Sequence, residues 1–93
     1  MDEERTADEI AAIYTAAGHS VNVINADANY SAYLTRTGYS ETEADWKAMI
    51  KRNTDHLEII KGYTKTDGTT SIWTSESFTD IDAAITKGKT LYA

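Results

Sequence analysis

Histidine and carboxylate side chains are the groups in this sequence that could carry out acid–base or metal chemistry. The chain has two histidines and no cysteine. A helical metal site needs a second ligand about four residues away, but the residues at those distances from His56 are Arg52 and Ile60. His19 follows Gly18, where a cation would suit the C-terminal end of a helix. We interpret both histidines as structural. The alternative is a small enzyme that uses His56 with a neighbouring carboxylate, and it requires His56 to face a concave pocket.

Several of the 15 carboxylates lie where helices are expected to begin. They include Asp8, Glu9, Glu41, Glu43 and Glu76. The helix dipole stabilises negative charge in a first turn, so these groups need no ligand to explain them. The sequence has no Gly-x-Ser-x-Gly elbow and no phosphate-binding glycine loop. The Asp67-Gly68 pair lacks the alternating acidic ligands of a calcium loop. We therefore expect no catalytic residue, cofactor or metal.

Two polar or aromatic features could still bear on function. Asn53 falls on the apolar stripe of an expected helix, and a buried amide without partners costs about 1–3 kcal/mol. We expect it to tie that helix to the backbone of a connector. Tyrosine and tryptophan often anchor protein interfaces, although a small core with one phenylalanine also needs them. The candidate partner-binding residues are Tyr30, Tyr33, Tyr39, Tyr63, Trp73 and Tyr92.

Length and composition restrict the possible classes of protein. The chain has 93 residues, a net charge of −6, 41% hydrophobic residues and 26% charged residues, which fits one globular domain over residues 1–93. No apolar run approaches the roughly 20 residues of a membrane span, and the acidic start lacks the apolar core of a signal peptide. Residues 1–46 alone carry nine acids and two bases. This excess disfavours direct binding to nucleic acid.

Apolar periodicity and capping signals predict two helices in the first half of the chain. Thr6 and Glu9 fit a capping box that begins the first helix, and Gly18 is expected to end it. Residues 19–26 are predicted to form an extended connector whose valines pack on the core. A second helix would be capped by Asp27 and ended by Gly38.

The third helix is predicted to be a long central one, at about residues 41–61. The segment 40–43 fits a second capping box, and Gly62 follows the last turn. Residues 63–73 are predicted to form a loop, with a small β-hairpin across Asp67-Gly68 as the alternative. A fourth helix would be capped by Thr74 or Ser75 and ended by Gly88.

These segments predict an all-α fold, a small single-domain bundle of three to four helices around a long central one. The central helix would contribute one apolar stripe, and the first and fourth helices would pack against it. The stripe consists of Trp46, Met49, Ile50, Leu57 and Ile60, and its expected partners are Ile10, Ile13, Tyr14, Phe78, Ile81 and Ile85.

The second half of the chain resembles a group of phage proteins. The resemblance covers residues 46–88 and consists of a Trp-led helix containing Arg52-Asn53-x-x-His56-Leu57, a Trp73-Thr74 helix start and a closing Ala84-Ile85-Thr86-x-Gly88. These motifs resemble small proteins of tailed bacteriophages, especially those of marine cyanobacterial hosts. The resemblance implies a phage origin and favours a role in the virion or its assembly, and it points to no particular activity.

Together, these observations favour a non-enzymatic phage structural protein, such as a minor capsid, cement, connector or tail component. It would contact other phage structural proteins or a second copy of itself, in the virion or in the host cytoplasm during assembly. The tyrosines and the loop from Lys65 to Trp73 are its candidate contact surfaces. The alternative is a small regulator that binds a host protein and imitates nucleic acid with an acidic face.

Overall fold

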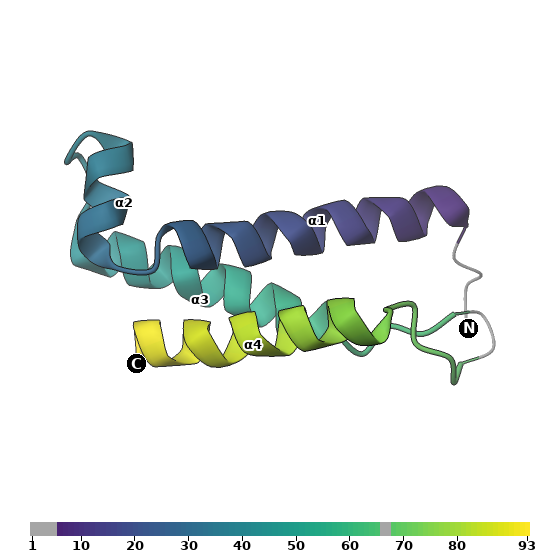
Figure 1. Cartoon of the computed structure of the whole chain (residues 1–93). Helices are drawn as coiled ribbons and strands as arrows, with labels where there is room; N and C mark the ends of the chain where they lie inside the picture. The colour runs from purple at the N-terminus through teal and green to yellow at the C-terminus, as the bar shows by residue number, and fades with distance from the viewer. Residues whose placement is uncertain (1–5, 66–67) are drawn as a thin grey trace.

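The computed structural model describes residues 6–65 and 68–93. These residues form four helices, α1 (Ala7–Ala26), α2 (Tyr30–Thr37), α3 (Glu43–Ile60) and α4 (Ser75–Tyr92). Figure 1 shows α1 and α4 running in one direction and α3 in the other, with the short α2 across the end at which α3 begins. The predicted all-α bundle with a long central helix is confirmed. No described helix has both the length and the apolar character needed to cross a membrane.

Helix α1 does not end at Gly18, and the predicted extended connector is wrong. Residues 19–26 continue the helix to Ala26. Beyond the glycine, the helical periodicity brings Ser20 and Ile24 into the interior, where they are 3% and 0% exposed. A glycine inside a helix costs about 1 kcal/mol relative to alanine. Burial of the following turn outweighs that cost. The position of the helix end is therefore set by the apolar pattern and not by the glycine.

Helix α2 begins two residues later than a cap at Asp27 predicts. Its N-cap is Asn29, whose side chain accepts a hydrogen bond from the amide of Ala32 at 2.7 Å. Gly38 follows the last turn with a φ of 74°, the left-handed conformation that glycine adopts without strain. This helix end is confirmed. Asp27 does not cap α2, because its side chain is buried and paired with Arg36.

Helix α3 is capped by a box two residues downstream of the predicted one. Thr42 accepts from the amide of Asp45 at 3.1 Å, and the Asp45 carboxylate accepts from the amide of Thr42 at 2.9 Å. The backbone hydrogen bond from Thr42 lowers the pKa of Asp45 below its usual value. Ser40 instead donates to the carbonyl oxygen of Thr37, so its hydroxyl closes the end of α2.

Helix α4 has the predicted cap at Thr74 but does not end at Gly88. The Thr74 hydroxyl accepts from the amide of Ser77 at 3.0 Å, and the helix continues to Tyr92. Gly88 is buried where α4 meets α3, and a Cβ added there would lie 2.0 Å from the Thr54 hydroxyl oxygen. This glycine permits close packing of two helices and does not terminate one.

The segment between α3 and α4 pairs with itself at one point. Thr64 and Ser71 form an isolated antiparallel bridge, and the amide of Lys65 donates to the carbonyl of Thr70 at 2.7 Å. The chain therefore reverses direction as the hairpin alternative expects. Of the predicted Asp67-Gly68 turn, Asp67 lies outside the described residues.

The core contains the predicted apolar stripe of α3. Two of the residues that were expected to pack against this stripe are exposed instead. All five stripe residues are buried, as are Ile81 and Ile85 of α4. Ile10 and Ile13 of α1 pack against the same cluster at partial burial. Tyr14 and Phe78 were expected in the core, but they are 43% and 37% exposed. Ile72 and Trp73 fill the interior at that end of the bundle, so these two rings stay at its surface.

Candidate functional site

A groove of about 320 Å³ separates α1 from the start of α4. These helices run side by side along one flank of the bundle (Figure 1). The groove is lined from α1, from α4 and from the residue just before α4's cap. The lining residues are Tyr14, Ala17, Gly18, Val21, Asn22, Trp73, Ser77, Asp80 and Ile81.

Two aromatic rings in tilted contact form one end of the groove. The Tyr14 and Trp73 ring centroids are 5.0 Å apart, and the Tyr14 hydroxyl donates to the carbonyl oxygen of Ile72. The Trp73 indole N–H donates to the carbonyl oxygen of Ile60 at 2.9 Å, at the end of α3. These bonds tie α1, α3 and the segment before α4 together, so the aromatic wall has a fixed position.

The floor of the groove is apolar and its rim is polar. Ala17 and Ile81 are each 3% exposed and form the floor. The rim carries Asn22, Ser77 and the carboxylate of Asp80, all exposed or half-exposed. Further along the same flank, the Lys87 ammonium donates to the Asn25 side-chain oxygen at 3.1 Å and bridges α4 to α1.

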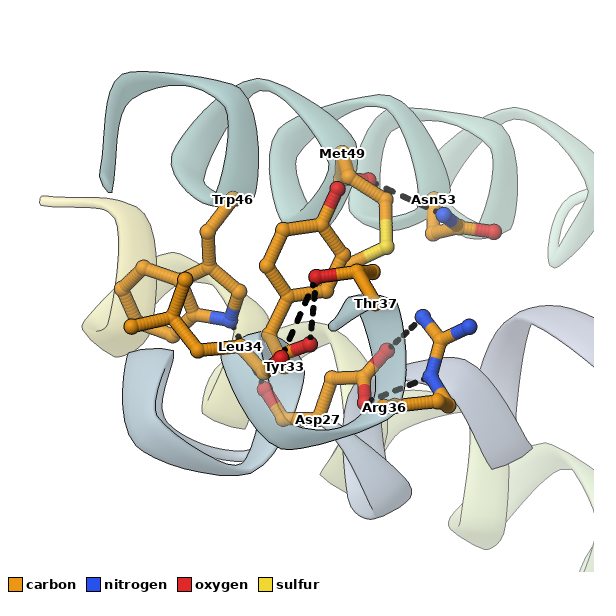
Figure 2. Close-up of polar contacts among 8 residues, drawn as sticks. All are labelled: Asp27, Tyr33, Leu34, Arg36, Thr37, Trp46, Met49 and Asn53. Atoms are coloured by element: carbon orange, nitrogen blue, oxygen red, sulfur yellow. Dashed lines mark hydrogen bonds and ion pairs between the residues drawn. The ribbon is translucent and has the colours of Figure 1, made fainter. Parts of the chain in front are cut away.

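A polar network joins α1, α2 and α3 at the opposite end of the bundle (Figure 2). The Asp27 carboxylate is 2% exposed and forms a two-pronged pair with Arg36, whose Nε donates to Oδ1 at 3.1 Å. The Asp27 carbonyl oxygen accepts from the Trp46 indole at 2.9 Å. The side chain that was expected to cap α2 therefore fixes α2 to the bundle.

Ring and guanidinium groups in this network perturb one another. The hydrogen bond and charge of Asp27 raise the pKa of Arg36. Burial raises the pKa of Tyr33, and the nearby charges of Glu41 and Asp45 add to the effect. The Arg36 guanidinium also lies 5.5 Å from the centre of the Tyr33 ring. Because both pKa values are raised, Tyr33 stays neutral and Arg36 stays charged at neutral pH. We interpret the network as a structural contact between the helices.

A second groove, of about 440 Å³, lies beside this network between α1, α2 and α3. His19, Arg36 and Arg52 contribute to its lining, together with the amides Asn22 and Asn53. Its single carboxylate, Asp27, is already paired with Arg36.

Asn53 has different partners from the predicted connector backbone. Its amide nitrogen donates to the carbonyl of Met49 in its own helix at 2.9 Å, and its oxygen accepts from the Ser20 hydroxyl at 3.0 Å. Because residues 19–26 are helical, no connector backbone is available at this position. Asn53 therefore links α3 to α1 through a side chain.

His56 contacts Ser20 of α1 and lines neither of the two grooves described above. Its Nδ1 lies 3.4 Å from the hydroxyl oxygen of Ser20, which is buried. It also borders a shallow hollow whose lining residues all come from α3. The one acidic residue in the lining of this hollow, Asp55, accepts a hydrogen bond from the Lys51 ammonium at 2.6 Å. In the described part of the chain, no three histidine or acidic side chains come together in a way that could hold a metal ion.

The six candidate partner-binding aromatics differ in their placement. Tyr33 and Trp73 are buried, at 7% and 8% exposure. Tyr30, Tyr63 and Tyr92 are half-buried and pack against the core clusters. Tyr39 alone of the six is largely exposed, at 72%. A partner-binding role for these residues stays a prediction.

Sequence reasoning placed Tyr14 in the core and so missed the α1–α4 groove. It also missed Gly18 and Asp80 as parts of one site. A signal for the groove was available, because Val21 continues the helical spacing of Tyr14 and Ala17 past the glycine. The contribution of α4 had no such signal, since only tertiary packing brings Asp80 close to α1.

No family model matches the chain, and the comparisons with curated proteins and with solved structures find no match either.

Proposed function

We propose that this protein is a non-enzymatic structural component that acts through protein–protein contacts, and that it belongs to the virion of a tailed phage. The α1–α4 groove is the observation that supports the binding role. It has an apolar floor, a fixed aromatic wall and a polar rim, which is the usual composition of a site that receives a side chain from a partner. The phage assignment comes from the resemblance of residues 46–88.

The partner would be another phage structural protein or a second copy of this chain. Either would place the protein in the virion, or in the host cytoplasm while the virion is assembled. The minor capsid, cement, connector and tail roles all act through protein–protein contacts, for which the α1–α4 groove is the candidate site.

The distribution of acidic groups gives less support to a nucleic-acid mimic. Asp8 and Glu9 lie at the start of α1, whereas Glu43 and Asp45 lie at the start of α3. Because α1 and α3 are antiparallel, these acids stand at opposite ends of the bundle (Figure 1). They form no continuous acidic face among the described residues, so we do not propose the regulator as a second function.

Mass spectrometry of purified virions tests the proposal. We expect the protein in wild-type virions at a constant ratio to the major capsid protein. A phage that encodes Gly18→Leu should lose it, because leucine would fill the groove. A phage that encodes Ala12→Leu should keep it, since Ala12 is exposed on α1 and does not line the groove. Absence of the wild-type protein from virions would contradict the proposal.

A further inference from the structure

We infer that the α1–α4 groove receives one apolar side chain from a partner segment that also carries a lysine or arginine, and that Gly18 keeps the groove open. The inference deepens the proposed function and rests on its binding role. Three features of the groove lead to it: a glycine inside a helix, a small apolar volume and an acidic rim.

Gly18 lies in the middle of a 20-residue helix, where alanine would be the more favourable residue. Its φ is not positive, so the backbone does not require glycine there. A Cβ built at Gly18 has no neighbour within 4 Å and would project into open space. Neither backbone conformation nor helix packing explains this glycine. Its position in the groove lining does, because any side chain there would take up part of the groove.

The groove has room for a single anchor. A volume of about 320 Å³ is at the low end of the roughly 300–1,000 Å³ of small-molecule sites. Its apolar lining comes from Tyr14, Ala17, Val21, Trp73 and Ile81. An aromatic or branched aliphatic side chain fits these dimensions better than an extended ligand. Such an anchor in a pocket is typical of the centre of a protein interface.

The rim favours a cation beside that anchor. Asp82, on the other side of α4, pairs with Lys61 of the bundle at 3.2 Å. Asp80 is exposed at the groove and makes no ion pair or hydrogen bond with any described residue. The Asn22 and Ser77 side chains beside it likewise have no described partner. A partner lysine or arginine would therefore meet an uncompensated carboxylate, in a chain whose net charge is −6.

Small probes can test the chemistry of the groove in the full chain. Tryptamine has an indole ring and an ammonium group, and indole-3-acetate has the same ring and a carboxylate. In ¹⁵N NMR titrations we expect tryptamine to shift the signals of Gly18, Val21, Asp80 and the Trp73 indole. It should bind at least about threefold more tightly than indole-3-acetate, as one exposed ion pair would produce. Asp80→Asn should remove this preference while the ring still binds.

Two further variants examine the glycine. Gly18→Leu should abolish the shifts, and Ala12→Leu, which adds the same side chain elsewhere on α1, should preserve them. Circular dichroism verifies that both variants stay helical. Equal affinity for the two probes, shifts outside the groove, or unchanged binding by Gly18→Leu would each overturn the inference. If the probes bind as expected but virions lack the protein, the virion role alone fails. If virions contain the protein but the probes do not bind, the anchor chemistry alone fails.

Discussion

At the scale of single residues, the Asp27–Arg36 pair is unequal. The Asp27 side chain is 2% exposed, whereas the Arg36 side chain is 55% exposed. Loss of Asp27 leaves an arginine that can turn into solvent. Loss of Arg36 leaves a carboxylate buried among α1, α2 and α3 without its counter-ion, and an unpaired buried charge is the costlier defect.

We therefore predict that Arg36→Gln destabilises the protein more than Asp27→Asn. The expected losses in free energy of unfolding at pH 7 are about 3 kcal/mol for Arg36→Gln and about 1 kcal/mol for Asp27→Asn. Lys51→Gln, which removes an exposed i,i+4 pair with Asp55, should cost less than about 0.5 kcal/mol and serves as the control. Urea unfolding measures all three. Equal losses in free energy of unfolding for the first two variants would show that the Asp27 carboxylate becomes hydrated when Arg36 is absent.

At the scale of the helices, two glycines that were both expected to end a helix have opposite roles. Gly18 and Gly88 each follow an apolar helical stretch, and each was expected to end a helix. Gly18 is exposed in a helix flanked by a groove. Gly88 is buried against Thr54, whose side chain is fully buried and donates to the carbonyl of Ile50 at 2.8 Å.

The same substitution should consequently have opposite effects at the two sites. Gly18→Ala is expected to raise the free energy of unfolding by about 0.5–1 kcal/mol, since alanine favours the helix and meets no neighbour. Gly88→Ala is expected to lower it by about 1–3 kcal/mol through overpacking against Thr54. Thermal and urea unfolding of both variants provide the measurement.

A double-mutant cycle identifies the cause at Gly88. Thr54→Ala removes the hydroxyl nearest to the added methyl group, so Gly88→Ala should cost less in that background than in the wild type. An unchanged cost would show that the two side chains do not conflict.

At the scale of the whole molecule, α2 is attached less firmly than the three long helices. The described chain measures 46 × 23 × 22 Å, and α2 lies across one end of that long axis (Figure 1). It has eight residues and one buried side chain, Tyr33, whereas α3 has six buried side chains. The Asp27–Arg36 pair joins α2 to the end of α1, and Tyr30 and Tyr33 pack against the core.

We predict that amide hydrogens of α2 exchange at least about tenfold faster than those of α3, because local opening exposes little apolar surface. Arg36→Gln should accelerate exchange in α2 further and leave the middle of α3 nearly unchanged. Hydrogen–deuterium exchange read by NMR tests both statements. Equal protection of α2 and α3 would place them in one cooperative unit.

Local sequence signals determined the class of the fold and several of its boundaries. The caps at Thr6 and Thr74, the left-handed Gly38 and the apolar stripe of α3 are all confirmed. Each of these features depends on residues within about one helical turn, where the spacing of side chains is fixed by the helix itself. A single sequence contains all the information needed for them.

The roles of the glycines, the aromatic residues and Asp27 depend on tertiary packing. Gly18 and Gly88 each follow an apolar helical stretch, but one borders a groove and the other touches Thr54. Trp73 is buried because it reaches the end of α3, and Asp80 belongs to the site because α4 lies beside α1. These outcomes depend on contacts between residues far apart in the chain. Local periodicity cannot specify them, since burial and charge pairing are set by how whole helices pack.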